Sequence, residues 1–153
     1  CRSSSRILQT RSRRLWRRKT ALKRKAAPYF ESVEVIELHH PDKVDAPSGT
    51  AATTAQRIGA ARANHHVSQS PDATETDPLG ARGARIDGVS VHAVRLRGLN
   101  AHEEVLLGNP GEQMVIRQDS FDRSSFMPGV LLAVRSVSGR GSLTYGLDEI
   151  MGL

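Results

Sequence analysis

Apolar side chains dominate residues 33–39, and this run predicts a buried strand. Pro41 and the turn-forming residues 45–49 end the run. Residues 49–63 (GTAATTAQRIGAARA) then carry apolar side chains at helical spacing, which predicts an alanine-rich helix. Gly59 inside this helix costs about 1 kcal/mol relative to alanine.

The periodicity disappears at residues 64–88, where proline, glycine and other turn formers predict a long loop. Three short segments rich in Val, Ile and Leu follow, at residues 89–97, 102–107 and 112–118. The connections between them, GLNA and GNPG, are very short. Connections of that length predict an antiparallel meander.

A second helix is predicted near the C-terminus, because four apolar residues share one helical stripe there. They are Phe126, Val130, Val134 and Val137. Pro128 is tolerated near the start of such a helix. The order of elements indicates an α+β fold in which two helices cover one face of a sheet.

The composition bounds the class of protein. The chain has 153 residues, which is enough for one domain with a buried core, and its 38% hydrophobic but 4% aromatic content predicts an aliphatic core. No apolar stretch is long enough to span a membrane or to act as a secretory signal. The single cysteine, Cys1, excludes an internal disulfide and fits a reducing compartment. We therefore expect a soluble, cytoplasmic protein.

The net charge of +6 is an average over two unlike parts. Residues 1–30 hold eleven Lys or Arg and no Asp or Glu. Residues 31–153 therefore hold the other eleven of the 22 Lys and Arg and all 16 Asp and Glu, which gives them a net charge of −5. The basic residues 1–25 lack turn signals and a clear apolar face, although Leu15, Trp16 and Leu22 leave room for a short basic amphipathic helix, and we expect a disordered or non-native extension. The alternative is a nucleic-acid or anionic-membrane contact through this extension.

The stretch ELHHPDKVDAPSGTA, residues 37–51, concentrates polar groups where the strand ends and the helix begins. Ser48, Gly49 and Thr50 open the helix, so unpaired N–H groups and the positive end of the helix dipole are expected to face outward there. That predicts an anion site. The alternative is an ordinary helix cap.

The ionisable residues of this stretch suggest proton transfer rather than metal binding. His39 and His40 point to opposite faces of an extended segment, so they cannot share one metal ion, and no metal site is expected. A histidine here can donate a proton near neutral pH, and Lys43 can hold a carboxylate or support developing charge. Asp45 is either a turn residue or a partner that orients Lys43. Taken singly, each could instead be a solvated surface residue.

The pattern Glu-x-His-His-x-x-Lys-x-Asp-x-Pro-Ser-Gly-Thr-Ala closely resembles the signature of the dihydrodipicolinate reductase family, in its actinobacterial branch. The similarity continues to the closing GLDEIMGL and covers about residues 26–153. It implies the family's C-terminal substrate and tetramerisation domain, with a mixed, mostly antiparallel sheet. The first thirty residues do not match the family's N-terminal Rossmann domain.

The resemblance implies an NAD(P)H-dependent oxidoreductase of lysine and diaminopimelate biosynthesis, which reduces 4-hydroxy-tetrahydrodipicolinate to tetrahydrodipicolinate. This chain would be the substrate-binding and proton-donating part of a homotetramer. The glycines in GARGAR (residues 80–85) and GRGS (residues 139–142) do not follow the pattern of a dinucleotide-binding turn. Although the family uses NADH or NADPH, we expect the isolated chain to be inactive.

Individual roles also follow from the resemblance. His39 would donate the proton that completes the reduction, and Lys43 would be a second donor or a charge stabiliser. The substrate's carboxylates would be held by His40, Ser48, Gly49 and Thr50. Arg123 and Phe126 would lie close to the nicotinamide and the domain hinge, as cofactor-binding residues.

Two other interpretations stay open. A nucleic-acid-binding module would place its affinity in residues 1–25, whereas a reductase would place it in residues 37–51. A non-catalytic assembly subunit would oligomerise through the sheet and bind no substrate analogue.

Overall fold

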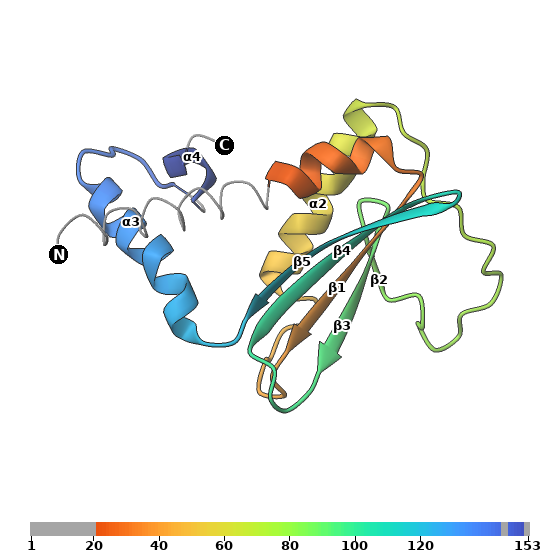
Figure 1. Ribbon diagram of the computed structural model, residues 1–153, viewed down its shortest axis with the longest axis horizontal. Coiled ribbons are helices and arrows are strands. Elements are labelled where there is room, and N and C mark those ends of the chain that lie inside the picture. The colour runs from red at the N-terminus through yellow and green to blue at the C-terminus, as the bar shows by residue number, and fades with distance from the viewer. Residues whose placement is uncertain (1–20, 145–146, 152–153) are drawn as a thin grey trace. The chain divides into compact units, whose positions relative to one another are not determined.

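The computed structural model describes residues 21–144 and 147–151 (Figure 1). Residues 21–26 are helical and lead into the 3₁₀ helix η1 (Ala27–Tyr29). The strands are β1 (Ser32–His39), β2 (Ala84–Ile86), β3 (Val89–Arg95), β4 (Ala101–Asn109) and β5 (Glu112–Ser120). The other helices are α2 (Gly49–Asn64), η2 (Arg123–Phe126), α3 (Met127–Val137) and α4 (Asp148–Met151).

The chain divides into two compact units. Residues 22–121 hold the sheet and α2, and the other unit holds η2, α3 and α4 from Asp122 onward. The α+β class and both predicted helices are confirmed. Of these two helices, α2 packs on the sheet. The other, α3, belongs to the second compact unit. No helix in the described ranges combines the length and the apolar character that a membrane crossing requires.

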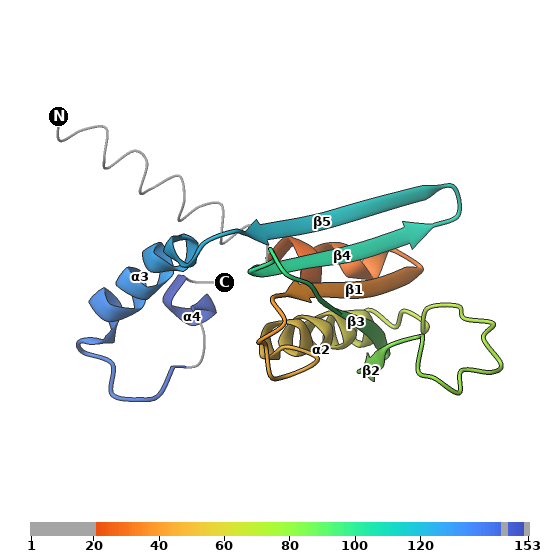
Figure 2. The ribbon, with the colours of Figure 1, turned by 90° about the horizontal axis from the view of Figure 1, so that it is seen from below.

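The five strands lie in the order β2-β3-β1-β4-β5 (Figures 1 and 2). β1 is central and pairs in parallel with β3, whereas its pairing with β4 and the β2–β3 and β4–β5 pairings are antiparallel. The mixed, mostly antiparallel sheet is therefore confirmed.

The predicted meander is wrong for its first two strands, because β1 lies between β3 and β4. Their connection, residues 96–100, passes the end of β1, and the Leu96 N–H donates to the His39 carbonyl at 3.1 Å. Two strand spacings are about 10 Å, and five extended residues reach roughly 17 Å. A short connection thus does not require adjacent strands. The sequence analysis also missed β2, which lies inside the predicted long loop.

α2 covers one face of the sheet (Figure 2), and most of its buried residues are small. Ala51, Ala55 and Ile58 are buried among aliphatic residues of β1, β3 and β4, as predicted for the core. Gly59 has a structural reason, since a Cβ there would lie 2.4 Å from the backbone oxygen of Asp87 in the β2–β3 turn. Only glycine lets the helix approach this turn so closely.

The boundary expected between residues 25 and 26 falls inside a helical segment, because residues 21–26 are helical and lead into η1. Lys23 is buried and forms an ion pair with Glu103 of β4. The Thr54 hydroxyl of α2 donates to the same carboxylate at 3.2 Å. The compensating charge lies 80 residues away, so local composition did not reveal it. Residues 1–20 of the expected extension lie outside the described residues.

Candidate functional site

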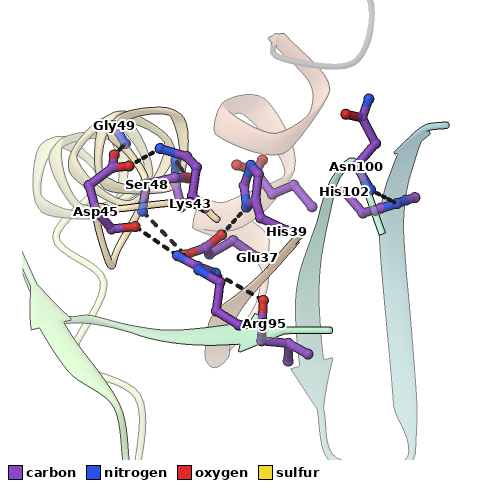
Figure 3. Close-up of polar contacts among 12 residues, drawn as sticks. Glu37, His39, Lys43, Asp45, Ser48, Gly49, Arg95, Asn100 and His102 are labelled. Atoms are coloured by element: carbon purple, nitrogen blue, oxygen red, sulfur yellow. Dashed lines mark hydrogen bonds and ion pairs between the residues drawn. The ribbon is translucent and has the colours of Figure 1, made fainter. Parts of the chain in front are cut away.

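The polar stretch of residues 37–51 forms the carboxyl end of β1, a turn and the start of α2 (Figure 3). Ser48 caps α2, and its hydroxyl accepts a hydrogen bond from the Ala51 N–H at 3.3 Å. A cis peptide bond between Ala46 and Pro47 lies just before this cap. The strand end and the helix start lie side by side, since the Ser48 N–H donates to Glu37 of β1.

Glu37 is the best buried side chain of the site, with 1% of its surface exposed. Its carboxylate contacts His39 Nδ1, and it accepts hydrogen bonds from the Ser48 N–H at 3.2 Å and from Arg95 Nη2 at 2.8 Å (Figure 3). Burial by itself raises the pKa of Glu37, but the Arg95 and His39 contacts outweigh burial and hold that pKa below its ordinary value. Glu37 is therefore a buried, ionised acceptor.

Lys43 and Asp45 form a second polar group at the helix start (Figure 3). The Lys43 ammonium pairs with Asp45 Oδ1, and Asp45 Oδ2 accepts a hydrogen bond from the Gly49 N–H at 3.3 Å. A Cβ on Gly49 would meet no atom within 4 Å, so the space beside it is open. A ligand carboxylate can approach the helix backbone there.

The expectation of unpaired N–H groups at the helix start needs correction. Three of the four N–H groups from Ser48 to Ala51 have acceptors within the protein. The acceptors are Glu37, Asp45 and the Ser48 hydroxyl, which compensate the end of the helix locally. Within the described chain the Thr50 N–H is the exception, and Thr50 is exposed.

The structure brings some of the predicted residues together and leaves others apart. His39, Lys43, Ser48 and Gly49 are linked through Glu37 and Asp45, as described above. His40 is 37% exposed, and its Nδ1 lies 3.8 Å from Asp42 Oδ2. The two residues expected near a cofactor, Arg123 and Phe126, begin and end η2 in the other unit.

The sequence analysis missed Glu37 and Arg95 as parts of the site. Glu37 could have been found, because residues two apart in a strand share a face and Glu37 therefore lies beside His39. Arg95 had no local signal. It comes from β3 and lies opposite His39 only because β3 runs parallel beside β1.

The arrangement suits an anionic ligand that must be protonated. An ionised carboxylate only accepts hydrogen bonds, so His39 Nδ1 is the donor toward Glu37, and the described residues give Nε2 no partner. Lys43 adds a positive charge beside the open space at Gly49. Among the described residues, no cluster of three or more His, Cys, Asp or Glu side chains could hold a metal ion.

Comparison with known proteins gives one family. The family model described as "Dihydrodipicolinate reductase, C-terminus" matches residues 19–151. The 4-hydroxy-tetrahydrodipicolinate reductase of Bifidobacterium animalis subsp. lactis is 72% identical over 130 residues, which are 84% of this chain and 51% of the relative. That of Bifidobacterium longum is 66% identical over 131 residues, 84% of this chain and 52% of the relative.

A solved structure has the same fold. It is the "Dipicolinate bound Dihydrodipicolinate reductase from Paenisporosarcina sp. TG-14", with a TM-score of 0.72 and 44% sequence identity. The match covers 86% of this chain and 49% of that protein. The chain thus spans about half the length of the curated relatives and of the solved structure that it matches.

Proposed function

The chain belongs to the dihydrodipicolinate reductase family, and on that premise we propose that it supplies the substrate-binding and proton-donating part of a 4-hydroxy-tetrahydrodipicolinate reductase. The observation that carries the proposal is that the His39–Glu37 pair and the Lys43–Asp45–Gly49 group both lie where β1 ends and α2 begins, with Arg95 donating to both. The relatives bear that enzyme name, and the solved neighbour is described as dipicolinate-bound.

In this proposal the ligand is a ring with two carboxylates. Lys43 and the Thr50 N–H in the first turn of α2 bind one carboxylate through charge-assisted hydrogen bonds, and the open space at Gly49 admits it. His40 and Thr50 are exposed enough to contact the ligand as well. His39 donates a proton from Nε2 to complete the reduction.

The hydride donor of this family is a nicotinamide nucleotide, NADH or NADPH. The described residues do not fit its phosphates. Residues 80–85 form a turn that leads into β2, and residues 139–142 follow α3, so neither glycine run lies between a strand and a helix. We infer that the half of the relatives outside this match binds the nucleotide, with Arg123 and Phe126 contributing from η2.

We also propose that the chain assembles with copies of itself, up to a tetramer, through the sheet face opposite α2. Residues on this face alternate with those that face the helix. Ile36 of β1 lies among them, and Val94 and Val115 are 37% and 48% exposed.

Neither the described residues nor the comparisons support the nucleic-acid alternative. The cytoplasmic location stays a prediction.

Titration with pyridine-2,6-dicarboxylate, followed by backbone amide shifts, tests the proposed site. We expect shifts confined to residues 37–51 and binding that weakens by about tenfold or more in Lys43→Ala, which loses one charged hydrogen bond of roughly 1.5–3 kcal/mol. Lys25→Ala removes the same charge from an exposed position and should bind like the wild type. Shifts elsewhere in the chain, or equal binding by the Lys43 variant, would refute the proposal.

A further inference from the structure

Glu37 is charged and almost wholly buried, and burial of a charge costs free energy unless hydrogen bonds and ion pairs compensate it. We propose that Glu37 is a positioning residue that keeps a proton on His39 Nδ1 and thereby reserves Nε2 for the substrate. The proposal rests on the proposed function, because it concerns the proton that His39 delivers.

The two carboxylate oxygens of Glu37 have different partners. Oε2 contacts His39 Nδ1, whereas Oε1 accepts both the Ser48 N–H at 3.2 Å and Arg95 Nη2 at 2.8 Å. With two donors on Oε1, the carboxylate is fixed in rotation and Oε2 must face the imidazole. The imidazole ring is 13% exposed, so it too has little freedom to turn.

Arg95 supports this arrangement from the neighbouring strand. It lies opposite His39 in the β1–β3 register and also donates to the Asp45 carbonyl at 2.7 Å. One guanidinium therefore connects the buried carboxylate with the turn that carries Lys43. The positive charge also keeps Glu37 ionised, which is required for an acceptor without a proton of its own.

The proton balance of the step is simple. In the imidazolium form both ring nitrogens carry a proton, and the Nδ1 proton stays in its bond to Glu37. The Nε2–H bond breaks, a new bond to hydrogen forms on the substrate, and the ring becomes neutral with its proton on Nδ1. A proton from water then restores the imidazolium. Glu37 stays ionised throughout and keeps accepting the hydrogen bond from Nδ1.

Nitrogen-15 shifts of the histidine rings test the tautomer directly in the isolated chain. At alkaline pH, where histidine is neutral, we expect His39 to be the Nδ1–H tautomer, with its signals assigned by their loss in His39→Ala. A wild-type His39 that carries its proton on Nε2 would overturn the proposal without any Glu37 variant.

Glu37→Gln should reverse the tautomer. The glutamine side chain has a single oxygen, and the Ser48 N–H and Arg95 both donate to it. Its NH₂ group then faces Nδ1 as a donor, so Nδ1 must accept and the neutral ring must carry its proton on Nε2. Glu34→Gln is the matched control, because Glu34 lies on the other face of β1 with contacts to Arg82 and His92. It should leave the His39 signals unchanged. An unchanged tautomer in a folded Glu37→Gln chain contradicts the proposal.

Turnover gives a second readout, in this chain fused behind the N-terminal half of the Bifidobacterium animalis relative. His39→Ala should lower kcat by about a hundredfold, and Glu37→Gln by about tenfold or more, with KM nearly unchanged in both. An effect of His39→Ala without one of Glu37→Gln would refute the role of Glu37 alone. No effect of His39→Ala would refute the proposed function itself.

Discussion

Two glycines of α2 have opposite surroundings, which indicates that one is needed for the fold and the other for ligand binding. Gly59 lies against the β2–β3 turn, where a Cβ would lie 2.4 Å from the Asp87 oxygen and 2.7 Å from its Cβ. Gly49, in the first turn, has open space instead. The fold therefore needs glycine at residue 59, whereas at residue 49 the proposed ligand needs it.

We expect Gly59→Ala to lower the free energy of unfolding by about 1–3 kcal/mol, because backbone atoms cannot move aside without shifting the turn. Gly49→Ala should leave that free energy unchanged or slightly higher, since alanine favours a helix. It should, however, weaken pyridine-2,6-dicarboxylate binding by filling the open space. Urea unfolding and the amide titration measure the two effects, and a destabilised Gly49→Ala or a tolerated Gly59→Ala would contradict this assignment.

Parts of the site that depend on neighbours along the chain could be predicted from the sequence, whereas parts that depend on distant residues could not. Ser48 as a helix cap depends on neighbours along the chain, and the sequence predicted a cap as the alternative to an anion site. Family membership also followed from the local pattern of residues 37–51, and the comparisons confirm it. Arg95 depends on which strand lies beside β1. Contacts of that kind are set by sheet topology, which short-range patterns do not specify.

Among the elements, the helical residues 21–26 show how a tertiary contact overrides composition. The segment is strongly basic, which predicted disorder. Lys23, however, pairs with Glu103 of β4, and Thr54 of α2 donates to the same carboxylate. One buried carboxylate thereby connects the helical residues 21–26, β4 and α2. The helix and strand types were predictable here, whereas their pairing was not.

Lys23→Ala should lower the free energy of unfolding by about 3 kcal/mol or more, because it leaves the Glu103 carboxylate buried without its cation. Lys25→Ala, two residues away and exposed, should change it by less than about 0.5 kcal/mol. The double variant Lys23→Met, Glu103→Leu should recover most of the loss, since it removes both charges. Equal urea midpoints for Lys23→Ala and Lys25→Ala would show that the ion pair contributes nothing.

At the scale of the whole molecule, the described carboxyl groups with a shifted pKa all have it lowered. They are Glu34, Glu37, Asp72, Asp77, Asp119 and Asp122. For Asp72, hydrogen bonds from Thr74 and Arg82 lower the pKa from its ordinary 3.8 to about 2. Asp122 belongs to one compact unit and the other five groups belong to the other, so each unit has acid-sensitive carboxyl groups.

The sign follows from linkage. A carboxyl whose pKa is lower in the folded state stabilises the fold above its unfolded pKa, and this contribution is lost as the pH falls through the folded pKa. With ordinary values of 4.5 for glutamate and 3.8 for aspartate, the contribution of these carboxyl groups to the free energy of unfolding should fall with acidification below about pH 4.5. The fall should continue toward pH 2, where Asp72 titrates.

Glu34→Gln allows the acid effect to be assigned to one group. Burial raises the pKa of Glu34, but the contacts with Arg82 and His92 outweigh burial and lower it. The variant should lose on the order of 1 kcal/mol at neutral pH, because it loses charged hydrogen bonds. The difference should shrink as the wild-type carboxyl becomes protonated and the two side chains become alike in charge. Urea unfolding across the acid range measures it, and a difference that persists or grows at low pH would show that Glu34 stabilises the fold by packing rather than by its charge.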